Sequence, residues 1–187
     1  AWRSSMTVAR EVSLKKTNDG YILKNIPVAQ LKKYQGKSTR KTIKVKAENQ
    51  LIEKSQIDLS KAVVDLDLKK MTAGKYTFAL KNALGEELTF GIDNTTKELF
   101  VDRSKSGNTD FGNHFATAVS KAPLNKVYSN VKMKLVIDKT SIEIFFNDGE
   151  KVLTEIFFPN EHFSELYLST DTKGSTLNIR GHQLNIN

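Results

Sequence analysis

The chain has 187 residues, of which 39% are hydrophobic and 27% charged, and it contains no cysteine. This length suits one ordinary domain with a core of its own, and the composition is globular rather than disordered. The lack of cysteine removes disulfides, cysteine nucleophiles and thiolate metal sites. No apolar run approaches the roughly 20 residues of a membrane-spanning helix, so we expect no membrane partner.

The formal net charge of +8 raises the question of nucleic-acid binding. The lysines are spread along the chain, and many alternate with apolar residues as solvent-facing strand positions do. Examples are Lys15, Lys16, Lys32, Lys33, Lys69, Lys70, Lys132 and Lys134. No RNA-binding motif or recognition-helix pattern accompanies them. We interpret them as a solvated basic surface and expect no nucleic-acid partner; a functional anion-binding face is the alternative.

In chain order, the first predicted element is a short helix at Val28–Tyr34, directly after Pro27. Alternation with a period of two then predicts a series of strands, separated by turn-forming sequences such as "MTAGK", "NALGE" and "DTKGS". About ten strands at regular spacing predict an all-β fold, a two-sheet antiparallel β-sandwich of the jelly-roll or concanavalin-like type. The predicted strands are 42–47, 63–68, 76–80, 88–92, 98–102, 131–138, 141–146, 152–158, 165–169 and 177–186.

Two successive hairpins can be placed in register from their apolar residues. Pairing Asp138 with Ser141 keeps the apolar residues of 133–137 opposite those of 142–146, all on one face. A three-residue loop, 148–150, with Gly149 in a left-handed conformation would extend this apolar face into 152–156. A two-residue loop would place Lys151 and Glu155 on the apolar face, so the pattern rejects it.

This register places Glu143 opposite Glu155 on the outer face, with β-carbons about 5 Å apart. Retaining glycosidases hold their two carboxyl groups about 5–5.5 Å apart, so a catalytic pair is one interpretation. Catalytic carboxylates must flank a substrate in a pocket, however, and two side chains next to each other on a flat strand pair cannot. We therefore interpret the two glutamates as part of a charged, solvated face.

Several segments, in the right order, resemble the C-terminal β-sandwich of glycoside hydrolase family 32, which contains levanases, inulinases, fructanases and invertases. They are "WRSSMTVAREVSL" (2–14), "GYILKNIPVAQL" (20–31), "VDRSKSGNTDF" (101–111), "APL" (122–124) and "LVIDKTSIEIFFNDGEKVLTEIFFP" (135–159). Departures from the family pattern are Asn25, Gln30 and Thr140, which stand where Gln, Glu and Ser are usual. The resemblance covers nearly the whole chain.

The resemblance implies that residues 1–35 are the junction and linker from a catalytic propeller and that 36–187 are the β-sandwich. The family's catalytic carboxylates lie in N-D-P-N, R-D-P and E-C blocks on that propeller, and none of these blocks occurs here. We therefore expect a fragment without hydrolase activity, from a parent that hydrolyses β-fructosidic bonds in levan, inulin or sucrose. The resemblance also implies an extracellular, periplasmic or cell-surface location.

The most family-specific cluster is a loop with the side chains of Asp102, Arg103, Ser104, Ser106 and Asn108. One interpretation is a structural brace, in which Arg103 pairs with an acid such as Glu143. The alternatives are a contact to the propeller and a site for a fructosyl unit.

Trp2, Arg3 and Arg10 lie in the junction segment and are the candidates for the propeller interface. Phe145, Leu153 and Phe157 would form an apolar stripe on the outer face, covered by the second sheet, the linker or another subunit. The three histidines lie far apart in the sequence, so we predict no metal site and no cofactor.

The resulting hypothesis is a non-catalytic domain that stabilises the parent's catalytic propeller. Two alternatives stay open: a fructan-binding module and a domain for homo-oligomerisation.

Overall fold

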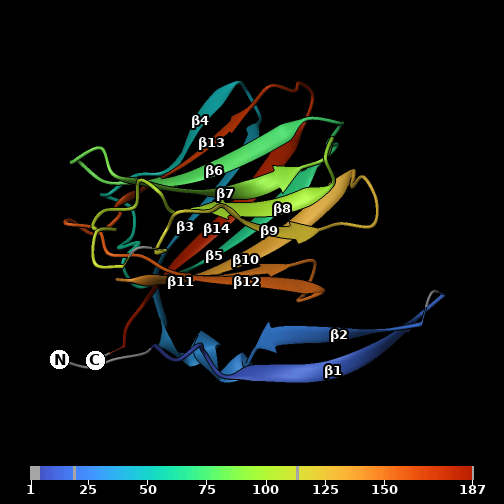
Figure 1. Cartoon of the computed structure of the whole chain (residues 1–187), viewed down its shortest axis with the longest axis horizontal. Helices are drawn as coiled ribbons and strands as arrows, with labels where there is room; N and C mark the ends of the chain where they lie inside the picture. Colours follow the sequence, from blue (N-terminus) through green and yellow to red (C-terminus); the bar gives the residue numbers. More distant parts are fainter. Residues whose placement is uncertain (1–4, 19, 113, 187) are drawn as a thin grey trace.

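The structure is a computed structural model that describes residues 5–18, 20–112 and 114–186, and Figure 1 shows its layers. A two-stranded hairpin comes first, made of β1 (Arg10–Thr17) and β2 (Gly20–Pro27). It is followed by η1, a 3-10 helix at Ala29–Tyr34. In the view of Figure 1 this hairpin lies below the rest of the molecule, next to β11 and β12. We call residues 5–34 the linker segment.

Two six-stranded antiparallel sheets follow. The strands of the first sheet, in spatial order, are β12 (Lys151–Ile156), β11 (Ser141–Phe146), β10 (Asn130–Asp138), β5 (Ala62–Lys69), β14 (Thr176–Leu184) and β3 (Gln35–Lys44). Those of the second sheet are β4 (Glu48–Ile52), β13 (Glu165–Thr170), β6 (Lys75–Lys81), β7 (Glu87–Asp93), β8 (Glu98–Asp102) and β9 (Ser120–Pro123).

The predicted all-β sandwich is confirmed, and each of the ten predicted segments overlaps a strand, although 42–47 reaches only the last three residues of β3. The predicted helix is present as the short 3-10 helix η1. The sequence pattern missed β1 and β2, which carry few buried residues, and also β4 and β9. These last two are the short strands at the edges of the second sheet, where alternation over four or five residues is a weak signal.

The main core fills the space between the two sheets. It includes Phe78 and Phe90 on neighbouring strands, both fully buried, with ring centroids 5.5 Å apart. Burial of large apolar side chains is the dominant favourable term in folding, so this core supplies most of the stability of the sandwich. Phe157, predicted on the outer face, belongs to this main core instead.

A second apolar cluster lies on the outer face of the first sheet. It consists of the buried residues Val63, Val136, Phe145 and Leu184, with Val8, Leu31 and Val152 packed against them. Val8 and Leu31 come from the linker segment. The linker therefore covers the part of this face that contains Phe145, which was one of the three coverings predicted for the apolar stripe.

The predicted pairing of β10 with β11 is confirmed, with Ile137 opposite Ile142 and Asp138 opposite Ser141. The predicted pairing of β11 with β12 is wrong by one residue. Phe146 lies opposite Lys151, so the loop has four residues, in which Asn147, Asp148 and Gly149 all have positive φ. The apolar pattern predicted the wrong register because β12 is an edge strand with partly buried residues on both faces. Leu153 packs against the main core, and Val152 packs against the second cluster.

Candidate functional site

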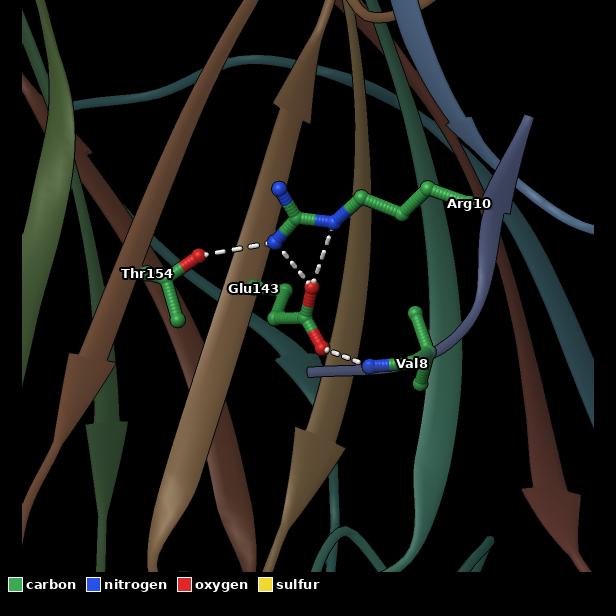
Figure 2. A network of polar contacts seen from close by, with 4 residues as sticks. All are labelled: Val8, Arg10, Glu143 and Thr154. Atoms are coloured by element: carbon green, nitrogen blue, oxygen red, sulfur yellow. Dashed lines mark hydrogen bonds and ion pairs between the residues drawn. The ribbon is translucent and has the colours of Figure 1, made fainter. Parts of the chain in front are cut away.

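Strand β11 places Glu143 on the outer face of the first sheet, but its side chain is only 6% exposed. Its carboxylate accepts a hydrogen bond from the Val8 amide at 2.7 Å and another from Arg10 Nε at 3.1 Å, and it forms an ion pair with Arg10 Nη2. Arg10 Nη2 also donates to Thr154 Oγ1 at 3.0 Å, as Figure 2 shows. The predicted solvated face is thus wrong for Glu143, because the linker segment packs over it.

The Arg10 side chain is held on a second side as well. Its guanidinium lies 5.2 Å from the ring centroid of Phe145, within the range of a cation–π contact. Charged hydrogen bonds in a low-dielectric setting are stronger than neutral ones, provided that each partner is satisfied. We call Val8, Arg10, Glu143 and Thr154 the linker anchor.

A backbone contact fastens the linker at a second point. The Asn25 amide donates to the Gly149 carbonyl at 3.0 Å, which joins β2 to the loop between β11 and β12. Gly149 has a φ of +79°, and a side chain there would overlap the Asn25 carbonyl oxygen. The close approach therefore requires glycine at this position. A looser ion pair, Lys15 to Glu150 at 3.9 Å, lies near the same loop.

Glu155 points to the opposite face of the sheet from Glu143. Its register partner is Ile142, whereas the partner of Glu143 is Thr154. The predicted side-by-side glutamate pair is therefore wrong, and these two carboxylates cannot act on one substrate. Glu155 forms an ion pair with Arg103 at 3.4 Å. Arg103 therefore pairs with an acid, as the brace interpretation expects, but the acid is Glu155 rather than Glu143.

Arg103 lies at the rim of the sandwich, just after β8 of the second sheet. Its Nη1 donates to the Ile156 carbonyl at 3.0 Å, and its guanidinium lies 4.3 Å from the centroid of the Phe115 ring. Its Nε is buried without a hydrogen-bond partner in the described part of the chain. The pair of Arg103 with Glu155 joins the second sheet to the edge strand β12 of the first sheet, and we call it the rim anchor.

The other polar side chains of the candidate loop take part in its own turns. Asp102 accepts from the Ser104 amide at 2.9 Å, and the Ser106 hydroxyl donates to the Arg103 carbonyl at 2.7 Å. The backbone amide of Asn108 donates to the Phe158 carbonyl at 2.8 Å. The side-chain oxygen of Asn108 accepts from the backbone amide of Asp110 at 3.1 Å. These contacts fold the loop and attach it to the segment after β12.

An aromatic cluster next to this loop was missed from the sequence. The ring centroids of Phe111, Phe115 and Phe158 lie 4.6–5.6 Å from one another. Phe111 is more than half exposed. No periodic pattern marks a cluster built from a loop and a strand end, so only the spacing of aromatic residues in "DFGNHF" could have indicated it.

The β1–β2 hairpin has one apolar face that nothing in the described chain covers. Leu14 lies opposite Leu23, so both point to the same side as Val12 and Tyr21, and all four are more than half exposed. Lys15 points to the other side, toward the sandwich, because it pairs with Glu150. The exposed apolar side chains therefore lie on the side of the hairpin opposite to Lys15, and Arg10, at the start of β1 on that same side by alternation, reaches back to Glu143.

Trp2 and Arg3, the other predicted interface residues, lie outside the described residues. Within residues 5–18, 20–112 and 114–186, no group of His, Cys, Asp and Glu side chains could hold a metal ion. The same part of the chain has no helix long and apolar enough to cross a membrane.

The fold is an antiparallel β-sandwich with an N-terminal linker segment fastened to the outer face of one sheet. The chain belongs to the family described as "Glycosyl hydrolases family 32 C terminal", whose model matches residues 28–183. This confirms the resemblance seen in the sequence.

Named relatives agree with this assignment. A levanase of Bacillus subtilis is 32% identical over 170 residues, which are 89% of this chain and 25% of the levanase. An extracellular exo-inulinase of Aspergillus niger is 27% identical over 188 residues, which cover 96% of this chain and 34% of the inulinase. The crystal structure of the exo-inulinase from Aspergillus awamori aligns with a TM-score of 0.80 at 27% identity, covering 98% of this chain and 36% of that one. The chain thus spans only a quarter to about a third of these relatives.

Proposed function

We propose that this chain is the non-catalytic C-terminal β-sandwich of a secreted, fructan-degrading family 32 enzyme and that it stabilises the catalytic propeller. The parent hydrolyses β-fructosidic bonds in levan, inulin or sucrose. The family assignment and the levanase and exo-inulinase relatives support this activity. Secretion is supported by the relative that is named as an extracellular enzyme.

The observation that carries the stabilising role is that the β1–β2 hairpin is fastened to the sandwich and still exposes apolar side chains. The linker anchor and the contact from Asn25 to Gly149 attach it to the sandwich. Val12, Leu14 and Leu23 are each more than half exposed. An isolated two-stranded hairpin is marginal in water, and a contiguous apolar face of this kind marks an interaction site. In this proposal the face packs on the propeller, residues 1–35 form the junction and 36–187 the domain.

The test compares one double substitution, Leu14→Ser with Leu23→Ser, in this chain and in the full-length parent. Both side chains are exposed in the chain alone, so we expect its unfolding free energy to change by no more than about 0.5 kcal/mol. In the parent the same change places two hydroxyls in an interface, so we expect its melting temperature and its residual activity on levan, inulin and sucrose after heating to fall. Leu84→Ser, an exposed leucine on the β6–β7 turn, is the matched control.

An unchanged parent would show that the propeller does not pack on this face. Dimerisation of the 187-residue chain that the double substitution abolishes, measured by analytical ultracentrifugation, would instead assign the face to a second copy. The chain alone should release no fructose from any of the three substrates, since it carries none of the family's carboxylate blocks.

Fructan binding at the loop of Asp102–Asn108 is a second candidate function. It is favoured by the exposed Phe111 ring next to that loop, since sugars stack on exposed aromatic faces. Calorimetric titration with levan, inulin, sucrose and fructose tests it. Binding that Phe111→Ala abolishes and Tyr21→Ala preserves would support a sugar site, and no heat from a folded sample would reject it.

A further inference from the structure

A cleft of about 870 Å³ lies between the linker segment and the outer face of the first sheet. Ile26, Pro27 and Lys32 border it on the linker side, and the exposed positions of β3, β5, β10 and β14 on the other. An adjoining hollow of about 630 Å³ shares Asp67, Lys132 and Asp148 with it, and we call the two neighbouring hollows together the groove. This groove is separate from the linker anchor and from the rim anchor.

The groove gathers positive charge that the sequence spreads widely. Nine Lys and Arg residues line it, against five Asp and Glu residues. The difference of +4 is half of the net charge of the whole chain. Five of the lysines that seemed dispersed in the sequence are among them: Lys15, Lys32, Lys69, Lys132 and Lys134. Their gathering in one groove favours the alternative interpretation, an anion-binding face, for these residues.

Three of the nine cations are already neutralised by acids of the chain. Lys134 pairs with Asp65, Lys69 with Asp67 at 3.1 Å, and Lys15 with Glu150 at 3.9 Å. The other six form no ion pair with a described residue. They are Lys24, Lys32, Arg40, Lys126, Lys132 and Arg180.

Arg40 and Arg180 are the centre of this unpaired charge. They lie directly opposite each other on the neighbouring strands β3 and β14, and both are exposed. Like charges in directly opposite positions destabilise a sheet. Two adjacent guanidinium groups offer several donors in fixed geometry, which suits a carboxylate or a phosphate. The repulsion between the two arginines lowers the stability of the free protein, and a bound anion offsets this repulsion.

Hydroxyl-binding groups lie beside the two arginines. The Thr42 hydroxyl donates to the Asn178 side chain at 2.9 Å, and Asn178 lies beside Asp67. Asp65 lies opposite Arg180 on the neighbouring strand. Carboxylates and amides accept hydrogen bonds from sugar hydroxyls, whereas the carboxylates repel a densely charged polyphosphate. We propose that this groove binds an acidic polysaccharide, whose carboxylates meet the arginines and lysines and whose hydroxyls meet the carboxylates and amides.

Nucleic acid fits this lining less well. Single strands bind by base stacking on free aromatic faces. The aromatic residues that line the groove are Phe145 and Tyr128. Phe145 is buried beneath Arg10, and the Tyr128 ring packs against Phe146 and lies under Lys126. Neither ring is free to take a base.

The test uses this chain and polygalacturonate, which carries one carboxylate per sugar, with binding measured by calorimetry over a range of salt concentrations. We expect binding that weakens as salt rises, because the contacts are between exposed charges. In the double variant Arg40→Gln with Arg180→Gln, affinity should fall about tenfold or more, since two charge-assisted contacts are lost. The control is Lys54→Gln with Lys173→Gln, which removes the same charge at exposed positions outside the groove and should change affinity less than about twofold.

Four further ligands test which chemical groups of the ligand the groove recognises. Methyl-esterified polygalacturonate and levan lack the charge and should bind at least about tenfold more weakly, since each charged hydrogen bond is lost. Equal losses in the groove and control variants would overturn the proposal, as would no binding of polygalacturonate at all. Tighter binding of polyphosphate or of single-stranded DNA than of polygalacturonate would assign the groove to a phosphate polymer instead. This inference does not depend on the proposed role toward the propeller.

Discussion

The hairpin of β11 and β12 carries an arginine–glutamate pair on each face, and the two pairs differ in what they join. Their side chains are similarly covered: 21% and 6% exposed for Arg10 and Glu143, and 20% and 11% for Arg103 and Glu155. The first pair attaches a segment that is not part of either large sheet. The second closes the edge between the two sheets.

This difference separates local from global stability. Loss of the linker anchor should free the linker segment while the core between the sheets stays packed, because that core contains no linker residue. Loss of the rim anchor should affect the whole sandwich, because it joins β12 of one sheet to the loop after β8 of the other. Proteins open in units of different stability, so the two effects can be measured separately.

The largest effect is expected for Glu143→Ala. It leaves Arg10 and the Val8 amide without their partner under the linker, and breaking a buried ion pair costs about 3 kcal/mol. Hydrogen-exchange protection of the β1–β2 amides should fall about a hundredfold, in keeping with that energy. Protection of β6 and β7 should not change.

Glu143→Gln is the matched control for this prediction, since it keeps an acceptor for Val8 and removes only the charge. We expect the hydrogen-exchange protection of β1–β2 in this variant to lie between that of the native chain and that of Glu143→Ala. If β6 and β7 lose protection together with β1 and β2, the linker is an integral part of the sandwich and the separation fails.

Arg103→Ala should have the next largest effect, and it should lower the stability of the whole sandwich rather than release the linker segment. It removes the ion pair with Glu155, the hydrogen bond to Ile156 and the contact with Phe115. Urea denaturation should show a loss of about 2 kcal/mol in global unfolding free energy. Arg180→Ala, an exposed arginine of the groove, is the control and should change stability by less than about 0.5 kcal/mol. A selective loss of protection in β1–β2 would contradict the assignment of Arg103 to the rim.

The outcome for the two glutamates shows where sequence reasoning succeeds and where it stops. The sandwich and the pairing of β10 with β11 were predictable because interior strands alternate cleanly between a core face and an outer face. The same alternation cannot say what packs on the outer face. Glu143 looked solvated because its cover, Val8 and Arg10, comes from more than 130 residues away in the chain.

The register of β12 failed for a related reason. An edge strand meets the rim of the sandwich, where a charged residue can point toward the core side and still find a partner, as Glu155 finds Arg103. The four-residue loop also depends on three consecutive positive φ values, two of them at non-glycine residues, which composition does not reveal. The candidate loop itself could be located from its motif, whereas its partners on β12 and the basic groove required the packed structure.

A smaller effect is expected when pH changes the charge of Glu86, which lies in the turn between β6 and β7. Burial raises the pKa of Glu86, but hydrogen bonds donated by Asn82 and Asn160 outweigh it and hold the pKa below its ordinary value of 4.5. A carboxyl whose pKa is lower in the folded state stabilises above its unfolded pKa and loses that contribution as pH falls through its folded pKa. Stability should therefore decline from about pH 4.5 downward, and Glu86→Gln should flatten this decline in acid-dependent melting curves. An unchanged decline would show that other carboxyls account for it.

The smallest effect is expected for Glu150→Gln, which removes the ion pair with Lys15 at the other end of the linker hairpin. The two side chains are 3.9 Å apart, and that of Lys15 is more than half exposed, so water and salt already screen the attraction. Such surface pairs contribute about 0–1 kcal/mol, and we expect less than about 0.5 kcal/mol here. Hydrogen exchange of β1–β2 should therefore match the native chain within about twofold. If Glu150→Gln frees the hairpin as much as Glu143→Ala does, the linker is held by distributed charge rather than by its buried anchor, and the contrast between the two faces of β11–β12 no longer explains how the linker is attached.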